Sequence, residues 1–280
     1  MNRTLILLAL VVLALSSTGA KNPEQTRPVR EGFVQSKNQR IHYLVTGSGP
    51  FLVMVHGMFG RAQDWFDSGW VERLALSHTL VIIDMRGHGL SDKPTAIADY
   101  SLDTMAEDVI AVMDTEGIAR TDYLGFSMGG KVAYSLMGRH VDRFGSFVIV
   151  SASPGAYDLS DYRKMLKNDF PDHWVFPDYP VIDDDYKRYF RSLNKESLLA
   201  LTDDSNWTDR TRLYVWCQKP VLVFYGADEP ESDKKDMREK GQYAAKSTII
   251  EIPGCDHIGL MVSSGILAPT VLEFLTGKRE

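Results

Sequence analysis

The chain has 280 residues, of which 44% are hydrophobic and 24% are charged, and its formal net charge at pH 7 is −6. This composition provides enough apolar side chains for a sizeable core and argues against general disorder. The sequence has a net negative charge and no run rich in lysine or arginine. It therefore argues against nucleic acid as a main partner, because that affinity depends on the neutralisation of phosphates.

Residues 1–20 have the pattern of a signal peptide. Arg3 supplies a positive charge, residues 5–15 are all apolar, and small residues follow up to Ala20. The apolar run is too short to span a bilayer, which takes ~20 residues. We therefore expect export to a periplasm or secretion, with cleavage before Lys21 and no stable membrane span.

The remaining chain predicts an α/β fold. A hairpin of two strands comes first, and apolar strands then alternate with helical segments, which is typical of a mainly parallel sheet covered on both faces. The expected strands are 32–35, 41–46, 51–56, 80–85, 121–125, 147–151, 221–225 and 247–252. The expected helices of the sheet layers are 63–75, 104–116, 129–138, 234–245 and 260–275.

Residues 154–216 interrupt this alternation. The segment is rich in tyrosine, tryptophan and phenylalanine and contains short helical pieces but no convincing core strand. It predicts a helical cap inserted between two parts of one α/β core, 21–153 and 217–280. We expect most of its aromatic rings to pack the cap onto the core and a few to line a pocket.

The two cysteines, Cys217 and Cys255, lie before one expected strand and after another. If those strands are parallel neighbours, the thiols lie at opposite ends of the sheet. A strand of five or six residues is ~17–20 Å long, whereas a disulfide needs Cα atoms within ~7 Å. We therefore expect two free thiols.

Residues 123–136, YLGFSMGGKVAYSL, contain two overlapping motifs. Gly125 to Lys131 resembles a phosphate-binding loop, but that motif needs Ser or Thr next to bind Mg²⁺, and the chain has Val132. We therefore interpret Lys131 as a surface residue of a helix. The alternative is G-x-S-x-G, the turn between a strand and a helix that exposes a nucleophilic serine, here Ser127.

The second motif is supported by the residues that follow it. Its chemistry requires a serine, an acid and a histidine in that order along the chain. Asp228 and Glu229 follow one expected strand, and His257 follows the last one. All of these positions lie at carboxyl ends of strands, where α/β sheets place their sites.

Several motifs resemble those of the α/β-hydrolase family, and most closely its capped esterase and carbon–carbon hydrolase branch. They are VHGMFG (55–60), DMRGHGLSDKP (84–94), GFSMGG (125–130), VLVFYGADEP (221–230) and GCDH (254–257). The resemblance extends from about residue 33 to the C-terminus. It implies an eight-stranded sheet, a cap after the sixth strand and hydrolysis without a cofactor.

On this basis Ser127 is the expected nucleophile, which needs an adjacent base to accept its proton. His257 is the expected base, since an imidazole titrates near neutrality. The candidates for the acid that orients the imidazole are Asp228 and Glu229, with Asp256 and Asp92 as distant alternatives. Related sequences favour the position of Glu229, but aspartate is the commoner acid and Glu229 is restricted by Pro230. We favour Asp228.

The resemblance also assigns an oxyanion hole to the backbone N–H groups of Met58 and Met128. His56 and His88 lie in loops of the family motifs, where such histidines brace the loop. No spacing of histidines or cysteines indicates a metal site.

The leading hypothesis is an exported serine hydrolase that cleaves a carboxylic ester of a small apolar molecule. A lactonase, a thioesterase and a carbon–carbon bond hydrolase would use the same triad. Haloalkane dehalogenases and most epoxide hydrolases of this family have an aspartate where Ser127 stands, which argues against both. A non-catalytic binding protein on the same fold is the alternative from another class.

Overall fold

The computed structural model describes residues 28–168, 179 and 182–277. Its centre is one eight-stranded sheet with the strand order β1-β2-β4-β3-β5-β6-β7-β8. The strands are β1 (Arg30–Ser36), β2 (Gln39–Gly47), β3 (Phe51–Val55), β4 (Thr79–Ile83), β5 (Thr121–Phe126), β6 (Phe144–Val150), β7 (Val221–Gly226) and β8 (Ser247–Ile252). Strand β2 is antiparallel to both of its neighbours, and the other neighbouring pairs are parallel. The predicted α/β class and antiparallel start are confirmed.

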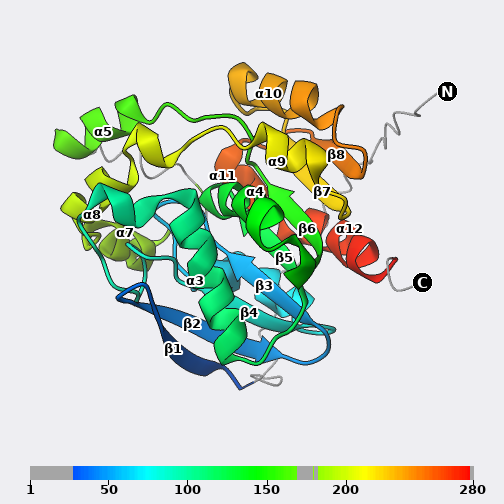
Figure 1. The fold of residues 1–280 in the computed structure, drawn as a ribbon, viewed down its shortest axis with the longest axis horizontal. Coiled ribbons are helices and arrows are strands. Elements are labelled where there is room, and N and C mark those ends of the chain that lie inside the picture. The colour runs from blue at the N-terminus through cyan, green and yellow to red at the C-terminus, as the bar shows by residue number, and fades with distance from the viewer. Residues whose placement is uncertain (1–27, 169–178, 180–181, 278–280) are drawn as a thin grey trace.

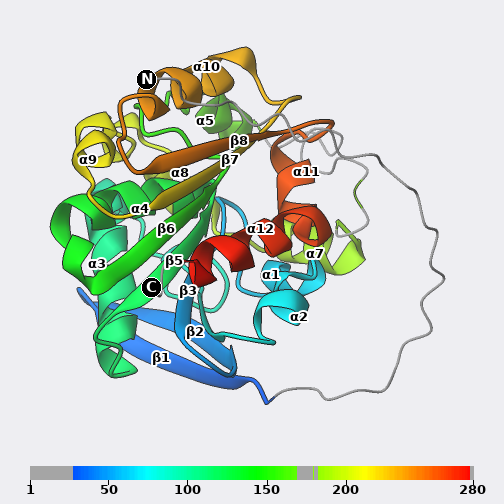
Figure 2. The same cartoon turned by 90° about the vertical axis from the view of Figure 1, so that its right-hand side faces the viewer.

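Helices cover both faces of the sheet (Figures 1 and 2). One face carries α3 (Leu102–Thr115), α4 (Met128–Arg139) and α9 (Thr211–Trp216), and the other carries α1 (Asp64–Asp67), α2 (Trp70–Leu74) and α12 (Ser264–Thr276). Helix α10 (Glu231–Gly241) packs against β7 and β8, and α11 (His257–Val262) follows β8. In the described part of the chain, three short 3₁₀ helices cover Ile97–Tyr100, Val141–Arg143 and Asp204–Asn206.

The core follows the pleat of the strands. In β3, Val53 and Val55 contribute to one hydrophobic cluster, and Leu52 and Met54 to the other. All four side chains are fully buried. Because successive side chains of a strand point to opposite faces, an uninterrupted apolar strand fills a core on both sides of the sheet. This is what the continuous apolar runs in the sequence predicted.

Two expected helices are each broken in two. Residues 63–75 form α1 and α2, because Gly69 adopts a left-handed backbone conformation with φ of 75°. Residues 260–275 form parts of α11 and α12, with Ser263 between them. The two breaks are in contact, since the Ser264 hydroxyl donates to the Ser68 carbonyl at 2.6 Å.

Between β6 and β7 the structure describes α5 (Ser160–Lys167), α7 (Asp184–Arg191), α8 (Lys195–Leu201) and α9. Helix α9 packs on α4 and α10. The helices of this segment agree with an insertion after the sixth strand, and the division into core and cap stays a prediction.

The expected signal peptide, residues 1–20, lies outside the described residues. Within the described ranges, the model contains no helix that combines the length and the apolar character needed to cross a membrane. Cys217 and Cys255 are both free, as expected, and both are buried.

Candidate active site

Ser127 stands on a sharp turn between β5 and α4. Its φ of 51° and ψ of −111° are strained for a residue with a side chain. The glycines on either side allow this turn. A Cβ atom on Gly125 would lie 2.4 Å from the backbone of Gly129, and one on Gly129 would lie 2.2 Å from the carbonyl oxygen of Val55. The G-x-S-x-G spacing is therefore a packing requirement of this turn.

His257 faces this serine from the first position of α11. Its Nε2 lies 3.0 Å from Ser127 Oγ, within hydrogen-bond distance. The imidazole also packs beside the ring of Phe126, with centroids 5.0 Å apart. Asp256 holds the start of the helix, because its Oδ1 accepts from Gly259 N–H at 2.7 Å and from the Tyr179 hydroxyl at 2.6 Å. The structure thus brings together the serine and histidine that the sequence singled out.

Of the two candidate acids, Glu229 is the one beside this histidine. Its side chain folds back over the end of β7, where Oε1 accepts from Gly226 N–H at 3.0 Å. Its Oε2 lies 4.0 Å from His257 Nδ1, and the side chain is buried. Asp228 is exposed, and its backbone N–H donates to the Cys255 carbonyl. The preference for Asp228 is therefore corrected, because the turn directs the neighbouring residue, not Asp228, into the site.

Sequence reasoning missed a further side chain, Ser151. It follows the last residue of β6, has φ of 56° and is 2% exposed. Its hydroxyl donates to Glu229 Oε1 at 2.8 Å and lies 2.5 Å from His257 Nδ1. Only its position at the carboxyl end of a central strand could have indicated it.

The carboxyl group of Glu229 is held as an anion. Burial would raise its pKa, but the facing His257 imidazole and the donors Gly226 N–H and Ser151 Oγ outweigh burial and lower the pKa below the usual value. A negative charge thus lies next to the imidazole across the neutral pH range, where it can stabilise an imidazolium.

The two amides expected to form the oxyanion hole lie on segments that are bonded to each other. Gly129 N–H, one residue after Met128, donates to the His56 carbonyl at 3.1 Å. A Cβ atom on Gly57 would lie 3.2 Å from Ser127 Cβ, so the loop before Met58 lies against Ser127. Within the described residues, neither Met58 N–H nor Met128 N–H has an acceptor. Both amides are therefore free to donate to a ligand.

Two buried histidines fix the loop that carries Met58. His56 Nε2 accepts from Met85 N–H at 3.1 Å, and His88 Nε2 accepts from Phe59 N–H at 3.0 Å. Each ring can then donate from Nδ1 to a backbone carbonyl, 2.7 Å away for His56 and 3.1 Å for His88. Burial lowers the pKa of both, to about 3 for His88. These rings act as neutral braces, as the sequence suggested.

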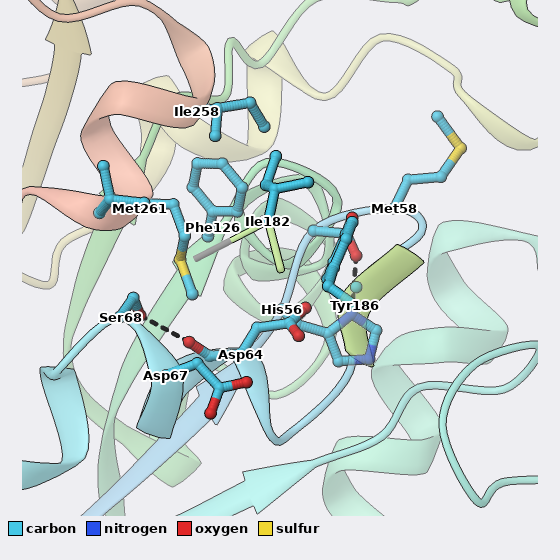
Figure 3. A pocket seen from close by; sticks show the side chains of 13 residues that line it. His56, Met58, Asp64, Asp67, Ser68, Phe126, Ile182, Tyr186, Ile258 and Met261 are labelled. Atoms are coloured by element: carbon cyan, nitrogen blue, oxygen red, sulfur yellow. Dashed lines mark hydrogen bonds between the residues drawn. The ribbon is translucent and has the colours of Figure 1, made fainter. Parts of the chain in front are cut away.

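A pocket adjoins the turn at Ser127 and residues 56–63, the segment between β3 and α1 that carries Met58 and is called the oxyanion loop below (Figure 3). Its apolar lining consists of Met58, Phe126, Ile182, Ile258, Met261 and Val262. Its polar lining consists of Asp64, Asp67, Ser68 and Tyr186, and Figure 3 shows the first three close together. Burial raises the pKa of Asp64 to about 7. The pocket therefore offers both apolar side chains and hydrogen-bonding groups.

Helix α7 contacts the oxyanion loop through two of its side chains. The Tyr189 hydroxyl donates to the Gly60 carbonyl at 2.7 Å, and the Arg61 guanidinium lies 2.9 Å from Asp185 Oδ2. The same guanidinium stacks on the Tyr189 ring, 4.5 Å from its centroid. These contacts connect α7 to the loop beside Ser127.

Lys131 is not a surface residue, contrary to expectation. Its side chain is fully buried, donates to the carbonyls of Ser153 and Gly155, and lies 4.3 Å from the centroid of the Tyr157 ring. Burial lowers its pKa to about 7. The lysine thereby holds the chain that leaves β6, and it does not face an open loop that could bind phosphate.

Across the described ranges, no three histidine, cysteine or acidic side chains gather in a way that could hold a metal ion.

Comparison with known proteins identifies the family. Residues 50–193, just over half of the chain, match the model of the alpha/beta hydrolase fold. The chain is 28% identical over 278 residues to epoxide hydrolase 2 of Caenorhabditis elegans, covering 84% of this chain and 77% of that protein. It is 32% identical over 116 residues to esterase YbfF of Escherichia coli, covering 41% of this chain and 43% of the esterase.

The chain spans about half the length, or less, of several curated relatives that it matches. Among solved structures, the enol-lactonase from Burkholderia xenovorans superposes with a TM-score of 0.78 and 22% identity, covering 88% of this chain and 100% of the lactonase. That likeness concerns the fold. With the family model matched over β3 to β6 and the turn at Ser127, the chain belongs to the alpha/beta hydrolase fold family, whose relatives are hydrolytic enzymes.

Proposed function

We propose that this protein is an exported serine hydrolase that cleaves carboxylic esters of small apolar molecules. The observation that supports the proposal most directly is the 3.0 Å contact between Ser127 Oγ and His257 Nε2 at a strained strand-to-helix turn. A binding protein has no need to hold a hydroxyl in a strained turn against an imidazole. The similarity to an esterase over part of the chain also favours ester cleavage.

In the proposed reaction, Ser127 Oγ attacks the ester carbonyl carbon while its proton passes to His257 Nε2. The resulting oxyanion accepts hydrogen bonds from Met58 N–H and Met128 N–H. The tetrahedral intermediate collapses as the bond to the alcohol oxygen breaks, and His257 returns the proton to that oxygen. Water then attacks the acyl-enzyme with the same base, which releases the carboxylic acid and frees Ser127.

The residue at position 127 separates this function from two others in the family. Epoxide hydrolases and dehalogenases that open carbon–oxygen or carbon–halogen bonds through an aspartate nucleophile require a carboxylate at this position. The chain has a serine there. The same mechanism can cleave lactones and thioesters, since each has an acyl carbon attached to a leaving oxygen or sulfur.

The test compares hydrolysis of p-nitrophenyl acetate and butyrate by the wild-type protein and by Ser127→Ala. We expect the substitution to abolish turnover and labelling by a fluorophosphonate probe, because both need the serine oxygen. Lactone and thioester substrates in the same assay would separate the alternatives. A wild-type protein that neither hydrolyses these substrates nor reacts with the probe at Ser127 would contradict the proposal.

Export is tested separately, by mass spectrometry of the protein recovered outside the cytoplasm. We expect a chain that begins at Lys21. A full-length chain retained inside the cell would contradict this part of the proposal.

A further inference from the structure

The carboxylate and the imidazole of this site do not touch each other. Glu229 Oε2 and His257 Nδ1 are 4.0 Å apart, which is too long for a hydrogen bond. The hydroxyl of Ser151 lies between the two side chains and is within hydrogen-bond distance of both. We propose that Ser151 is a positioning residue that carries the orienting hydrogen bond from Glu229 to His257, an inference that rests on the proposed hydrolase function.

The hydrogen-bonding capacity of the three groups fixes the direction of each bond. An ionised carboxylate only accepts, so the single proton of the Ser151 hydroxyl goes to Glu229 Oε1. The oxygen of Ser151 can then only accept from His257, which places the imidazole proton on Nδ1. Nε2 is left unprotonated and directed at Ser127, the tautomer that a general base needs.

The backbone of Ser151 supports a role beyond packing. Five residues other than glycine have positive φ in the described chain. Lys37 and Asn38 form the turn of the first hairpin, and the other three are Phe59, Ser127 and Ser151. Phe59 lies on the oxyanion loop and Ser127 is the nucleophile. Strained backbone of this kind persists where the surroundings enforce it, often at functional sites.

The surroundings of Ser151 do enforce this position. Its N–H donates to the Phe224 carbonyl of β7 at 2.8 Å, which ties the end of β6 to the strand that leads to Glu229. The hydroxyl is thereby held at a fixed point between two strand ends. The acid and the base come from different loops, and Ser151 provides the link between them.

The test is a double-mutant cycle on kcat/KM with Ser151→Gly, Glu229→Gln and the combined variant. Glycine removes the hydroxyl but accepts positive φ without strain, so the fold is retained. We expect Ser151→Gly to lower kcat/KM about 10- to 100-fold, the size of a lost hydrogen bond to a charged group. Glu229→Gln should then cost much less in the Ser151→Gly background than in wild type, because the link is already broken.

The pH dependence of kcat/KM would not change if Ser151 only supported the fold. Without its acceptor at Nδ1, the imidazolium loses stabilisation, so the acidic limb of kcat/KM should move to lower pH in Ser151→Gly.

Ser135→Ala is the matched control. Ser135 is also a buried serine, but its hydroxyl has no hydrogen-bond partner among the described residues, and we expect wild-type kinetics. The proposal would be overturned if the losses in kcat/KM caused by Ser151→Gly and Glu229→Gln simply multiply in the double variant. A pH profile of Ser151→Gly like that of Ser135→Ala would also overturn it.

A spectroscopic measurement keeps this inference separate from the proposed function. We expect a downfield imidazole N–H proton resonance in the wild type that is lost in His257→Gln and displaced in Ser151→Gly. If the resonance is unchanged in Ser151→Gly but displaced in Glu229→Gln, the carboxylate bonds the imidazole directly and the proposal fails. This result does not depend on any substrate, so it decides the matter even for a protein that cleaves no ester.

Discussion

The turn after β7 places two neighbouring carboxylates in opposite environments. Glu229 N–H donates to the Gly226 carbonyl at 3.2 Å, and the Glu229 side chain returns to accept from Gly226 N–H. This closed turn buries Glu229 and leaves Asp228 in solvent. The order of residues alone does not reveal it, because either acid lies at the correct strand end.

We predict that Glu229→Gln and Asp228→Asn differ sharply in ester hydrolysis. Loss of the Glu229 charge should lower kcat by at least about 10²-fold, within the range of up to ~10⁴ seen when a triad acid is neutralised. Asp228→Asn changes an exposed side chain and should leave kcat within about twofold of wild type. Steady-state kinetics of the two variants decides this. A large loss in Asp228→Asn with none in Glu229→Gln would restore the acid that the sequence favoured.

What could be predicted at this scale depended on the type of residue. Ser127 and His257 were found because a motif and the order along the chain single them out. Ser151 and the burial of Lys131 were not found, since a serine after a strand and a lysine in a helix have no pattern of their own. Their roles depend on contacts with segments distant in sequence, such as Glu229 and Gly155.

The loop between β3 and α1 carries Met58, whose N–H we propose as part of the oxyanion hole. Its backbone is held by His56 and His88 and by Asp84, whose Oδ1 accepts from Ala62 N–H at 2.6 Å. Both rings are wholly buried and serve as acceptors through Nε2. A protonated ring would have no lone pair at Nε2 and would lose this bond.

We predict that acid destabilises the protein partly through His88. Its pKa in the fold is about 3, below the ordinary value of about 6.5, so the unfolded chain takes up this proton first as the pH falls. The stabilisation is therefore complete above about pH 6.5 and is lost progressively between about pH 6.5 and 3. Thermal melts of wild type and His88→Asn over this range test it. We expect lower stability at neutral pH but a shallower pH dependence in the variant, and parallel curves would contradict the assignment.

The elements themselves were predictable where the sequence pattern is local. The expected strand 247–252 coincides with β8, and the others agree to within a few residues. The breaks in helices 63–75 and 260–275 were not expected, because a single Gly69 or Ser263 is compatible with a helix. The contact between the two breaks, through Ser264, is a tertiary feature.

At the scale of the whole molecule, a buried ion pair joins the loop after β4 to helix α3. Arg86 Nε and Nη2 lie 2.7 and 2.6 Å from the two carboxylate oxygens of Asp108, and both side chains are fully buried. The guanidinium also donates to the Asp99 carbonyl at 2.8 Å. The paired geometry satisfies both charges.

We predict that Arg86→Met lowers the free energy of unfolding by about 3–5 kcal/mol, because it leaves the carboxylate of Asp108 buried without its partner. The double variant Arg86→Met/Asp108→Leu should recover most of the loss, since no charge then remains buried. Urea unfolding measures both. Lys164→Met, which breaks the exposed pair with Asp161, serves as the control and should have no comparable effect. A double variant less stable than Arg86→Met would contradict this account.

The two buried thiols mean that the chain can fold without forming a disulfide. Cys217 and Cys255 are the only cysteines, and both are unbridged. The native structure therefore requires no thiol oxidation and no disulfide isomerase. A chain that we expect to act outside the cytoplasm can thus reach the same fold in a reducing compartment, and reductants such as dithiothreitol have no covalent cross-link to remove.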